Sequence, residues 1–186
     1  MSTGAAQDAR VLVAGIGNIF LGDDGFGSEV ARVLAAGPVP AAVRVTDYGI
    51  RGMHLAFDLL EGFDALVLVD TVPSRGSPGT LHVLEVGPDD LGEGELDAHG
   101  MAPTAVLASL GSLGGALPRT IVVGCEPATL DEQIGLSPQV AAAVDRAADT
   151  VRSLLTEELW ATGRAVPAGS HVSHGPSPAA GKENPR

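Results

Sequence analysis

The sequence is poor in cysteine and in positive charge, and it has no long hydrophobic run. Its 186 residues include one cysteine, Cys125, so an internal disulfide and a cysteine-only zinc site are excluded. With 11 basic and 23 acidic residues the net charge is −12, and the chain lacks the electrostatic attraction of a non-specific nucleic-acid or anionic-membrane binder. No apolar run approaches the ~20 residues that cross a bilayer, and residues 1–10 lack the pattern of a signal peptide. We therefore expect a cytoplasmic protein that binds neither nucleic acid nor membranes, of a size compatible with a monomer.

Enough apolar material is present for a packed core, with 45% hydrophobic and 18% charged residues. The length suits one domain, and we assign residues 11–162 to a single α/β domain after a flexible N-terminus at residues 1–10. Residues 163–186 are dominated by proline, glycine and serine without any period, which predicts a disordered tail. Residues 86–98 carry five acids and no base, so we expect a solvated loop or, alternatively, a binding surface for a basic partner.

Short apolar strands alternate with helical patterns along the domain. Continuous apolar runs, which suit parallel strands buried on both faces, occupy residues 11–15, 43–48, 65–70 and 120–124. Residues 79–86 alternate between apolar and polar instead, which predicts an edge or antiparallel strand. Helical periodicity is present at residues 25–36, 52–62 and 102–110, and again from Ser137 to Gly163. This order predicts one layered α/β domain.

Apolar stripes indicate which helix faces are buried. In the second helix the stripe comprises Leu55, Leu59 and Leu60. The last helix is expected to begin with Ser137 as its cap and Pro138 in its first turn. Its apolar stripe then comprises Val140, Val144, Ala147, Val151, Leu154, Leu155 and Leu159.

Three polar residues stand where predicted strands end or a helix begins. Asp24 follows the first strand, Asp70 ends the third, and His99 lies just ahead of the third helix. In an open parallel sheet, ligands bind beyond the carboxyl ends of the strands, where the strand order reverses. If the first and third strands are neighbours, as in the common 2-1-3 order, the three side chains can converge on one ligand.

This combination of side chains favours a divalent metal ion. Two ionised carboxylates repel each other unless a proton or a cation lies between them, and imidazole is a favoured ligand of zinc, copper, iron and nickel. Three protein ligands leave coordination positions open for a substrate. Each residue also has a structural explanation: Asp24 as a helix cap or as a charge that complements the helix dipole, Asp70 as an acceptor for the amides of its own turn, and His99 as a surface residue.

A dinucleotide site is an alternative for the same loop. The GIG motif at residues 15–17 follows a strand, and Asp47 stands where a ribose-binding acid belongs. Two features weaken this alternative. Phe20 occupies the third glycine position, and Asp23 and Asp24 would repel a pyrophosphate at the mouth of the site.

The sequence is similar to the nickel–iron hydrogenase maturation endopeptidases from about Val11 to Leu159. Five blocks occur in the family's order: GIGNIFLGDDGFG, DYGIRGMHL, ALVLVDTV, DAHGMAPTAVL and GCEPATLDEQIGLSPQV. The fold that the resemblance implies is a twisted five-stranded sheet between helices, which agrees with the order of predicted elements. We therefore expect a three-layer α/β fold, with a mostly parallel five-stranded twisted sheet, helices on both faces and one antiparallel edge strand.

The resemblance implies an aspartyl endopeptidase that removes the C-terminal extension of a nickel–iron hydrogenase large-subunit precursor after nickel insertion. The catalytic, metal-contacting residues of the family fall on Asp24, Asp70 and His99, with Asp24 in place of the glutamate of many relatives. Nickel would arrive with the precursor, so no resident cofactor is expected. Asp47 would bind substrate, in a loop that lacks the family's threonine. The block around Cys125 resembles family structure, not a nucleophile.

Two questions of mechanism and function stay open at the level of sequence. The metal either polarises the scissile carbonyl or activates water, or else it only positions the substrate while one aspartate acts as general base. A non-catalytic chaperone that holds the precursor is the alternative function, and a dinucleotide-binding α/β protein is a further one.

Overall fold

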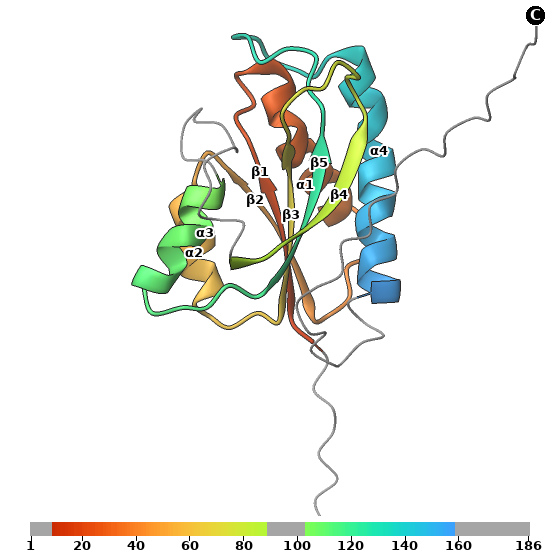
Figure 1. Ribbon diagram of the computed structural model, residues 1–186. Coiled ribbons are helices and arrows are strands. Elements are labelled where there is room, and N and C mark those ends of the chain that lie inside the picture. The colour runs from red at the N-terminus through yellow and green to blue at the C-terminus, as the bar shows by residue number, and fades with distance from the viewer. Residues whose placement is uncertain (1–8, 89–102, 159–186) are drawn as a thin grey trace, which may run out of the picture.

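The structure is a computed structural model that describes residues 9–88 and 103–158. Within these ranges five strands form one sheet in the order β2-β1-β3-β5-β4 (Figure 1). The strands are β1 (Val11–Ile16), β2 (Val43–Gly49), β3 (Ala65–Thr71), β4 (Leu81–Val86) and β5 (Arg119–Cys125). All neighbouring pairs are parallel except β4 with β5, which is antiparallel and lies at one edge. The mostly parallel sheet with one antiparallel edge strand confirms the expected fold class.

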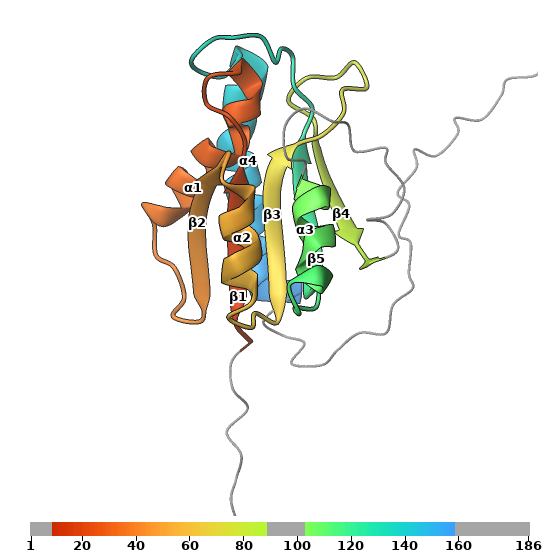
Figure 2. The ribbon, with the colours of Figure 1, turned by 90° about the vertical axis from the view of Figure 1, so that its left-hand side faces the viewer.

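Helices cover both faces of the sheet and complete three layers (Figure 2). α1 (Phe26–Ala35) and α4 (Pro138–Ser153) pack together on one face, and α2 (Gly52–Leu59) and α3 (Pro103–Ser112) pack together on the other. A short 3-10 helix, η1 (Gly22–Gly25), leads into α1, and a π-helical turn, η3 (Leu154–Glu158), follows α4.

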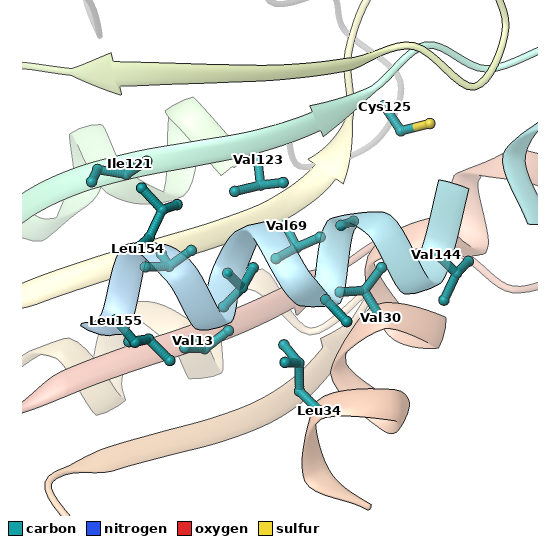
Figure 3. Close-up of a cluster of buried hydrophobic side chains, with 14 of the residues drawn as sticks. Val13, Val30, Leu34, Val69, Ile121, Val123, Cys125, Val144, Leu154 and Leu155 are labelled. Carbon is teal, nitrogen blue, oxygen red and sulfur yellow. The ribbon is translucent and has the colours of Figure 1, made fainter. Parts of the chain in front are cut away.

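The central strands are buried on both faces, which explains their uninterrupted apolar sequences. In β1, Val11 and Val13 face the core beneath α1 and α4, whereas Leu12 and Ala14 face the core beneath α2 and α3. Figure 3 shows the first of these cores, in which the apolar stripe of α4 lies against β1, β3 and β5. The stripe predicted for α4 is buried as far as Leu155.

Close packing of α1 against the sheet depends on glycine. A Cβ atom on Gly27 would overlap the carbonyl oxygens of Ile16 and Val69, which belong to two neighbouring strands. The first turn of α1 therefore lies directly against the ends of β1 and β3. This contact brings the loop before α1 close to the end of β3.

Two local expectations differ from the structure. Leu60 is 42% exposed, because α2 ends at Leu59 and Leu60 already belongs to the turn that follows the helix. Ser137 is the N-cap residue of α4, but its hydroxyl donates to Asp23 Oδ2 at 2.9 Å instead of capping the helix. The last helix continues beyond Ser153 as the π-helical η3 to Glu158, and its expected end at Gly163 lies outside the described residues.

Several expectations fall on residues that the structure does not describe: the flexible start at 1–8, most of the acidic segment 86–98, His99 and the tail at 163–186. Across the described ranges, every helix is too short or too polar to cross a bilayer.

Candidate active site

The carboxyl ends of β1 and β3 form the crevice where the strand order reverses. From β1 the chain passes through η1 and α1 to β2 on one side, whereas β3 lies on the other side of β1. Asp24 lies in η1, just beyond β1, and Asp70 lies near the end of β3. The expected 2-1-3 order is therefore present, and it brings both aspartates to one edge of the sheet.

Thr71 connects the two carboxylates. Its hydroxyl donates to Asp24 Oδ1 at 3.3 Å, and its backbone N–H donates to Asp70 Oδ1 at 2.7 Å. The Thr71 side chain also hydrogen-bonds Asp70, so one residue contacts both acids. The two acids thus share one small polar site although they are 46 positions apart in the sequence.

Asp70 is difficult to ionise in this setting. Burial and, to a smaller extent, the neighbouring charge of Asp24 raise the pKa of Asp70 to about 8, although hydrogen bonds from Thr71 oppose this rise. A nearby cation would favour the ionised form, because it offsets both the loss of hydration and the repulsion between the two acids. Asp24 and Asp70, called the acid pair below, are therefore placed to bind a cation together.

Asp24 is held from its own loop and does not serve as a helix cap. Its Oδ2 accepts the backbone N–H of Asn18 at 2.7 Å, and neither η1 nor α1 has a side-chain capping bond. The carboxylate is therefore oriented by the turn that joins β1 to η1. Asp24 therefore does not cap a helix, whereas its place in the first turn of η1 is compatible with a favourable interaction with a helix dipole.

The third expected ligand, His99, lies outside the described residues, so the structure does not test its place in the site. Among residues 9–88 and 103–158, no three His, Cys, Asp or Glu side chains cluster closely enough to hold a metal ion. The described part of the chain contributes two of the three predicted ligands, Asp24 and Asp70.

Asp47 lies at the end of β2, on the same edge of the sheet. Its Oδ1 accepts the Ser28 hydroxyl at 2.8 Å and the Gly49 N–H at 2.9 Å, while the residue itself is exposed. The Ser28 bond ties the end of β2 to α1. The second oxygen of Asp47 has no bond to the described residues and faces an accessible surface.

The loop after β1 is not arranged to bind a pyrophosphate. The N–H of Gly17 donates to Gly49 O at 3.1 Å, and the N–H of Asn18 donates to the Asp24 carboxylate. Backbone donors that would bind phosphate oxygens are thus already occupied within the protein. The geometry disfavours the dinucleotide alternative.

Asp23 is a structural residue whose importance was not apparent from the sequence. Its side chain is fully buried and accepts four hydrogen bonds from the segment between β5 and α4. The donors are the N–H groups of Ala128, Thr129 and Ser137 and the Ser137 hydroxyl, at 2.6–3.1 Å. Asp23 thereby fixes the loop that carries Asp24 against a second loop more than a hundred residues away.

Glu126 is a second buried acid that the sequence reasoning did not single out. Its Oε2 accepts the N–H groups of Arg75 and Ser77 at 2.8 and 3.0 Å, and its Oε1 lies 2.9 Å from His82 Nε2. These hydrogen bonds hold the pKa of Glu126 below its usual value. The carboxylate fastens the chain that leaves β3 to the end of β5.

Cys125 lies at the end of β5 with no exposed surface (Figure 3). Burial, together with the nearby charge of Asp23, raises the pKa of the Cys125 thiol to about 11. A protonated, inaccessible thiol is a poor nucleophile, which agrees with the expectation of a small buried residue.

Comparison with known proteins decides the family. A family model described as hydrogenase maturation protease matches residues 29–154, more than half of the chain. The chain is 35% identical to the hydrogenase expression/formation protein HupD of Rhodobacter capsulatus, over 91% of this chain and 80% of the relative. It is 31% identical to the hydrogenase 2 maturation protease of Escherichia coli, over 80% of this chain and 92% of the relative. The chain belongs to the hydrogenase maturation protease family.

Solved structures agree with this assignment of the protease. The hydrogenase maturating endopeptidase HybD from E. coli superposes with a TM-score of 0.68 at 30% identity, covering 80% of this chain and 94% of that one. A hydrogenase 2 maturation peptidase from a Thaumarchaeota archaeon gives a TM-score of 0.63 at 32% identity, covering 80% and 99%. The protease is therefore a peptidase with the HybD-like α/β fold, and the resemblance stated from the sequence blocks is confirmed.

Proposed function

We propose that this maturation protease removes the C-terminal extension of a nickel–iron hydrogenase large-subunit precursor after nickel has been inserted. In this proposal Asp24, Asp70 and His99 bind the nickel that the precursor carries. Nickel is then part of the substrate, and the protease needs no resident metal. The observation that carries the proposal is the meeting of Asp24 and Asp70 at the reversal of strand order, bridged by Thr71.

The chemistry of the acid pair explains why metal would govern the reaction. Without a cation, burial and the charge of Asp24 keep the pKa of Asp70 near 8, so the two acids cannot both ionise easily. A nickel ion presented by the precursor supplies the missing positive charge, and two carboxylate oxygens with one imidazole nitrogen match its preferences. Only the loaded precursor would dock fully and bring its scissile bond to the site.

The residues around the acid pair have distinct roles in this proposal. Asp70 and Asp24 orient the loaded precursor through its nickel. One of the two carboxylates also accepts a proton from the attacking water. Water adds its hydroxyl to the scissile carbonyl carbon, and the released amine of the extension takes up a proton. Asp47, exposed at the end of β2, recognises the chain next to the cleaved bond.

We also propose that the protease acts as a monomer in the cytoplasm. Support comes from the single reduced cysteine and from the size of the described domain, which has its own core on both faces of the sheet.

Incubation with nickel-loaded and nickel-free precursor tests the metal requirement. We expect the loaded precursor to lose the mass of its extension and the nickel-free precursor to stay intact, as measured by mass spectrometry. Equal cleavage of both would disprove nickel recognition. A stable complex with the loaded precursor and no loss of mass would instead favour the chaperone.

Asp70→Asn tests the acid pair directly, because it keeps the shape of the side chain and removes its charge. We expect the rate of cleavage to fall by about 100-fold or more, as for the loss of one group that stabilises charge in an active site. Asp149→Asn changes an exposed aspartate of α4 and is the matched control. Unchanged cleavage by Asp70→Asn would remove Asp70 from the site.

A further inference from the structure

A groove lies on the α1–α4 side of the sheet, next to η1. It has a volume of about 430 Å³ and runs between η1, α1, the residues before α4 and the first half of α4. Its apolar wall includes Ile19, Val33, Ile134, Leu136 and Val144. We refer to it below as the docking groove.

The loops at the mouth of the docking groove expose large apolar side chains. Ile134 is 81% exposed and Phe20 is 61% exposed, and Ile19 and Leu130 are each about half exposed. All four lie on the two loops that Asp23 holds together, the one after β1 and the one before α4. Ile19 and Ile134 line the groove itself, and several large exposed apolar side chains on two neighbouring loops favour an interaction surface.

Backbone hydrogen bonds keep the two loops together without the help of a partner. Gln133 N–H donates to Phe20 O at 3.0 Å, Gly22 N–H donates to Gln133 O at 2.9 Å, and Asp23 N–H donates to Thr129 O at 3.1 Å. Figure 2 shows the loop before α4 standing beside η1, beyond the carboxyl ends of the strands. The apolar surface is therefore preformed.

The surroundings of the docking groove are acidic. Asp145 lines it, and Asp131 and Glu132 lie on the loop that carries Ile134. Glu29 and Arg32 also line the groove, but they pair with each other at 2.7 Å and add no net charge. The carboxylate of Asp145 makes no side-chain hydrogen bond or ion pair with the described part of the chain. An occupant that is apolar and carries lysine or arginine beside its apolar residues matches this surface in both respects.

The docking groove and the Asp24–Asp70 site share η1. Gly22 and Gly25 line the groove and belong to the same short helix as Asp24, although neither Asp24 nor Asp70 lines it. The groove is therefore a separate surface that is connected to the acid pair through η1.

We propose that the docking groove binds an apolar segment of the large-subunit precursor, flanked by basic side chains and separate from both its metal centre and its extension. This inference rests on the proposed function, since it names a second contact with the same substrate. Binding in the docking groove would supply affinity that does not depend on nickel. Asp24 and Asp70 would then distinguish the nickel-loaded precursor from the nickel-free one.

The test uses the full-length protease with nickel-loaded precursor, and measures the dissociation constant and the steady-state constants of cleavage. Ile134→Asp places a charge on the apolar rim, at a side chain so exposed that folding is not at risk. Asp145→Lys reverses the charge of the groove wall. Val39→Asp is the matched control, because Val39 is an exposed aliphatic residue in the loop before β2, at the opposite end of the strands.

We expect Ile134→Asp and Asp145→Lys each to weaken binding of the precursor by tenfold or more and to raise KM, with kcat unchanged. Val39→Asp should match the unsubstituted protease in all constants. Unchanged affinity in both groove variants would overturn the docking proposal while leaving the proposed function intact. If the unsubstituted protease neither binds nor cleaves loaded precursor, both proposals fail. A loss of self-association in Ile134→Asp, with precursor binding unaffected, would show that a second copy of the chain occupies the groove.

Discussion

Asp23 and Asp24 are adjacent in the chain but differ in burial and in hydrogen bonding. Asp23 is fully buried and has four donors around its two oxygens, so it has no capacity left for a ligand. Asp24 is partly exposed, with one backbone donor and one weaker hydroxyl contact. The first residue holds the loop, and the second presents a carboxylate to the crevice.

Asp23→Asn should destabilise the protease strongly. The amide nitrogen cannot accept a hydrogen bond, so at least one buried N–H or hydroxyl loses its partner, at a cost of about 2–4 kcal/mol in the free energy of unfolding. Urea denaturation monitored by circular dichroism measures this cost. Asp131→Asn, on the exposed part of the partner loop, is the control and should change stability by less than about 1 kcal/mol. Equal stability of the two variants would contradict the structural role of Asp23.

The sequence allowed Asp24 and Asp70 to be predicted as site residues because each follows a recognisable strand. The role of Asp23 was not predictable, because its donors lie 105 to 114 residues further along the chain. Ser137 is an instructive case: serine before proline is a good helix-start signal, and α4 does begin there, but the hydroxyl bonds to Asp23. Local patterns place a helix end correctly without revealing what the side chain contacts.

At the scale of elements, α1 and the sheet meet at unusually short range. Gly27 lies in the first turn of α1 against the backbone of β1 and β3, and its Ser28 neighbour bonds Asp47 at the end of β2. One helical turn therefore contacts the ends of three strands. The position of this turn determines how far Asp24 lies from Asp70 and Asp47.

Gly27→Ala should push α1 away from the sheet. The added methyl group meets backbone oxygens that cannot rotate away, so we expect a loss of about 1–3 kcal/mol in the free energy of unfolding and reduced cleavage. Gly111→Ala is the matched control, since Gly111 is also helical and has open space around it. The control should be neutral or more stable by up to about 1 kcal/mol, as alanine favours the helix. Equal effects in both variants, measured by urea denaturation, would show that the short contact is unimportant.

Strands and helices with a strong hydrophobic period were predicted from the sequence, whereas the ends of α2 and α4 were not. The apolar runs of β1, β3 and β5 are continuous because both faces are covered, and they were located to within a residue or two. Leu60 was expected in a buried stripe that α2 is too short to extend to. The end of α4 depends on a π-helical turn, for which periodicity has no signal.

At the scale of the whole molecule, the reactivity of the single cysteine shows whether the core is closed or open. Cys125 belongs to the core between the sheet and the α1–α4 layer, so a reagent can reach it only when that core opens. The high pKa of its thiol, about 11, slows any reaction further.

Alkylation with iodoacetamide should therefore leave native protease unlabelled and fully active at neutral pH. In concentrated urea the same reagent should add one label per chain, as counted by mass spectrometry. Rapid labelling of the native protein with loss of cleavage would mean that the thiol takes part in the reaction, contrary to its burial.

The tether through Asp23 has one more consequence. Because it joins the loop bearing Asp24 to the loop bearing Ile134, the separation between the acid pair and the apolar rim is constant. A polypeptide anchored at the rim thus reaches the carboxylates after a set number of its own residues. The bond that is cut would then be selected by its spacing from the anchored stretch as well as by the contact of Asp47 with the chain beside it.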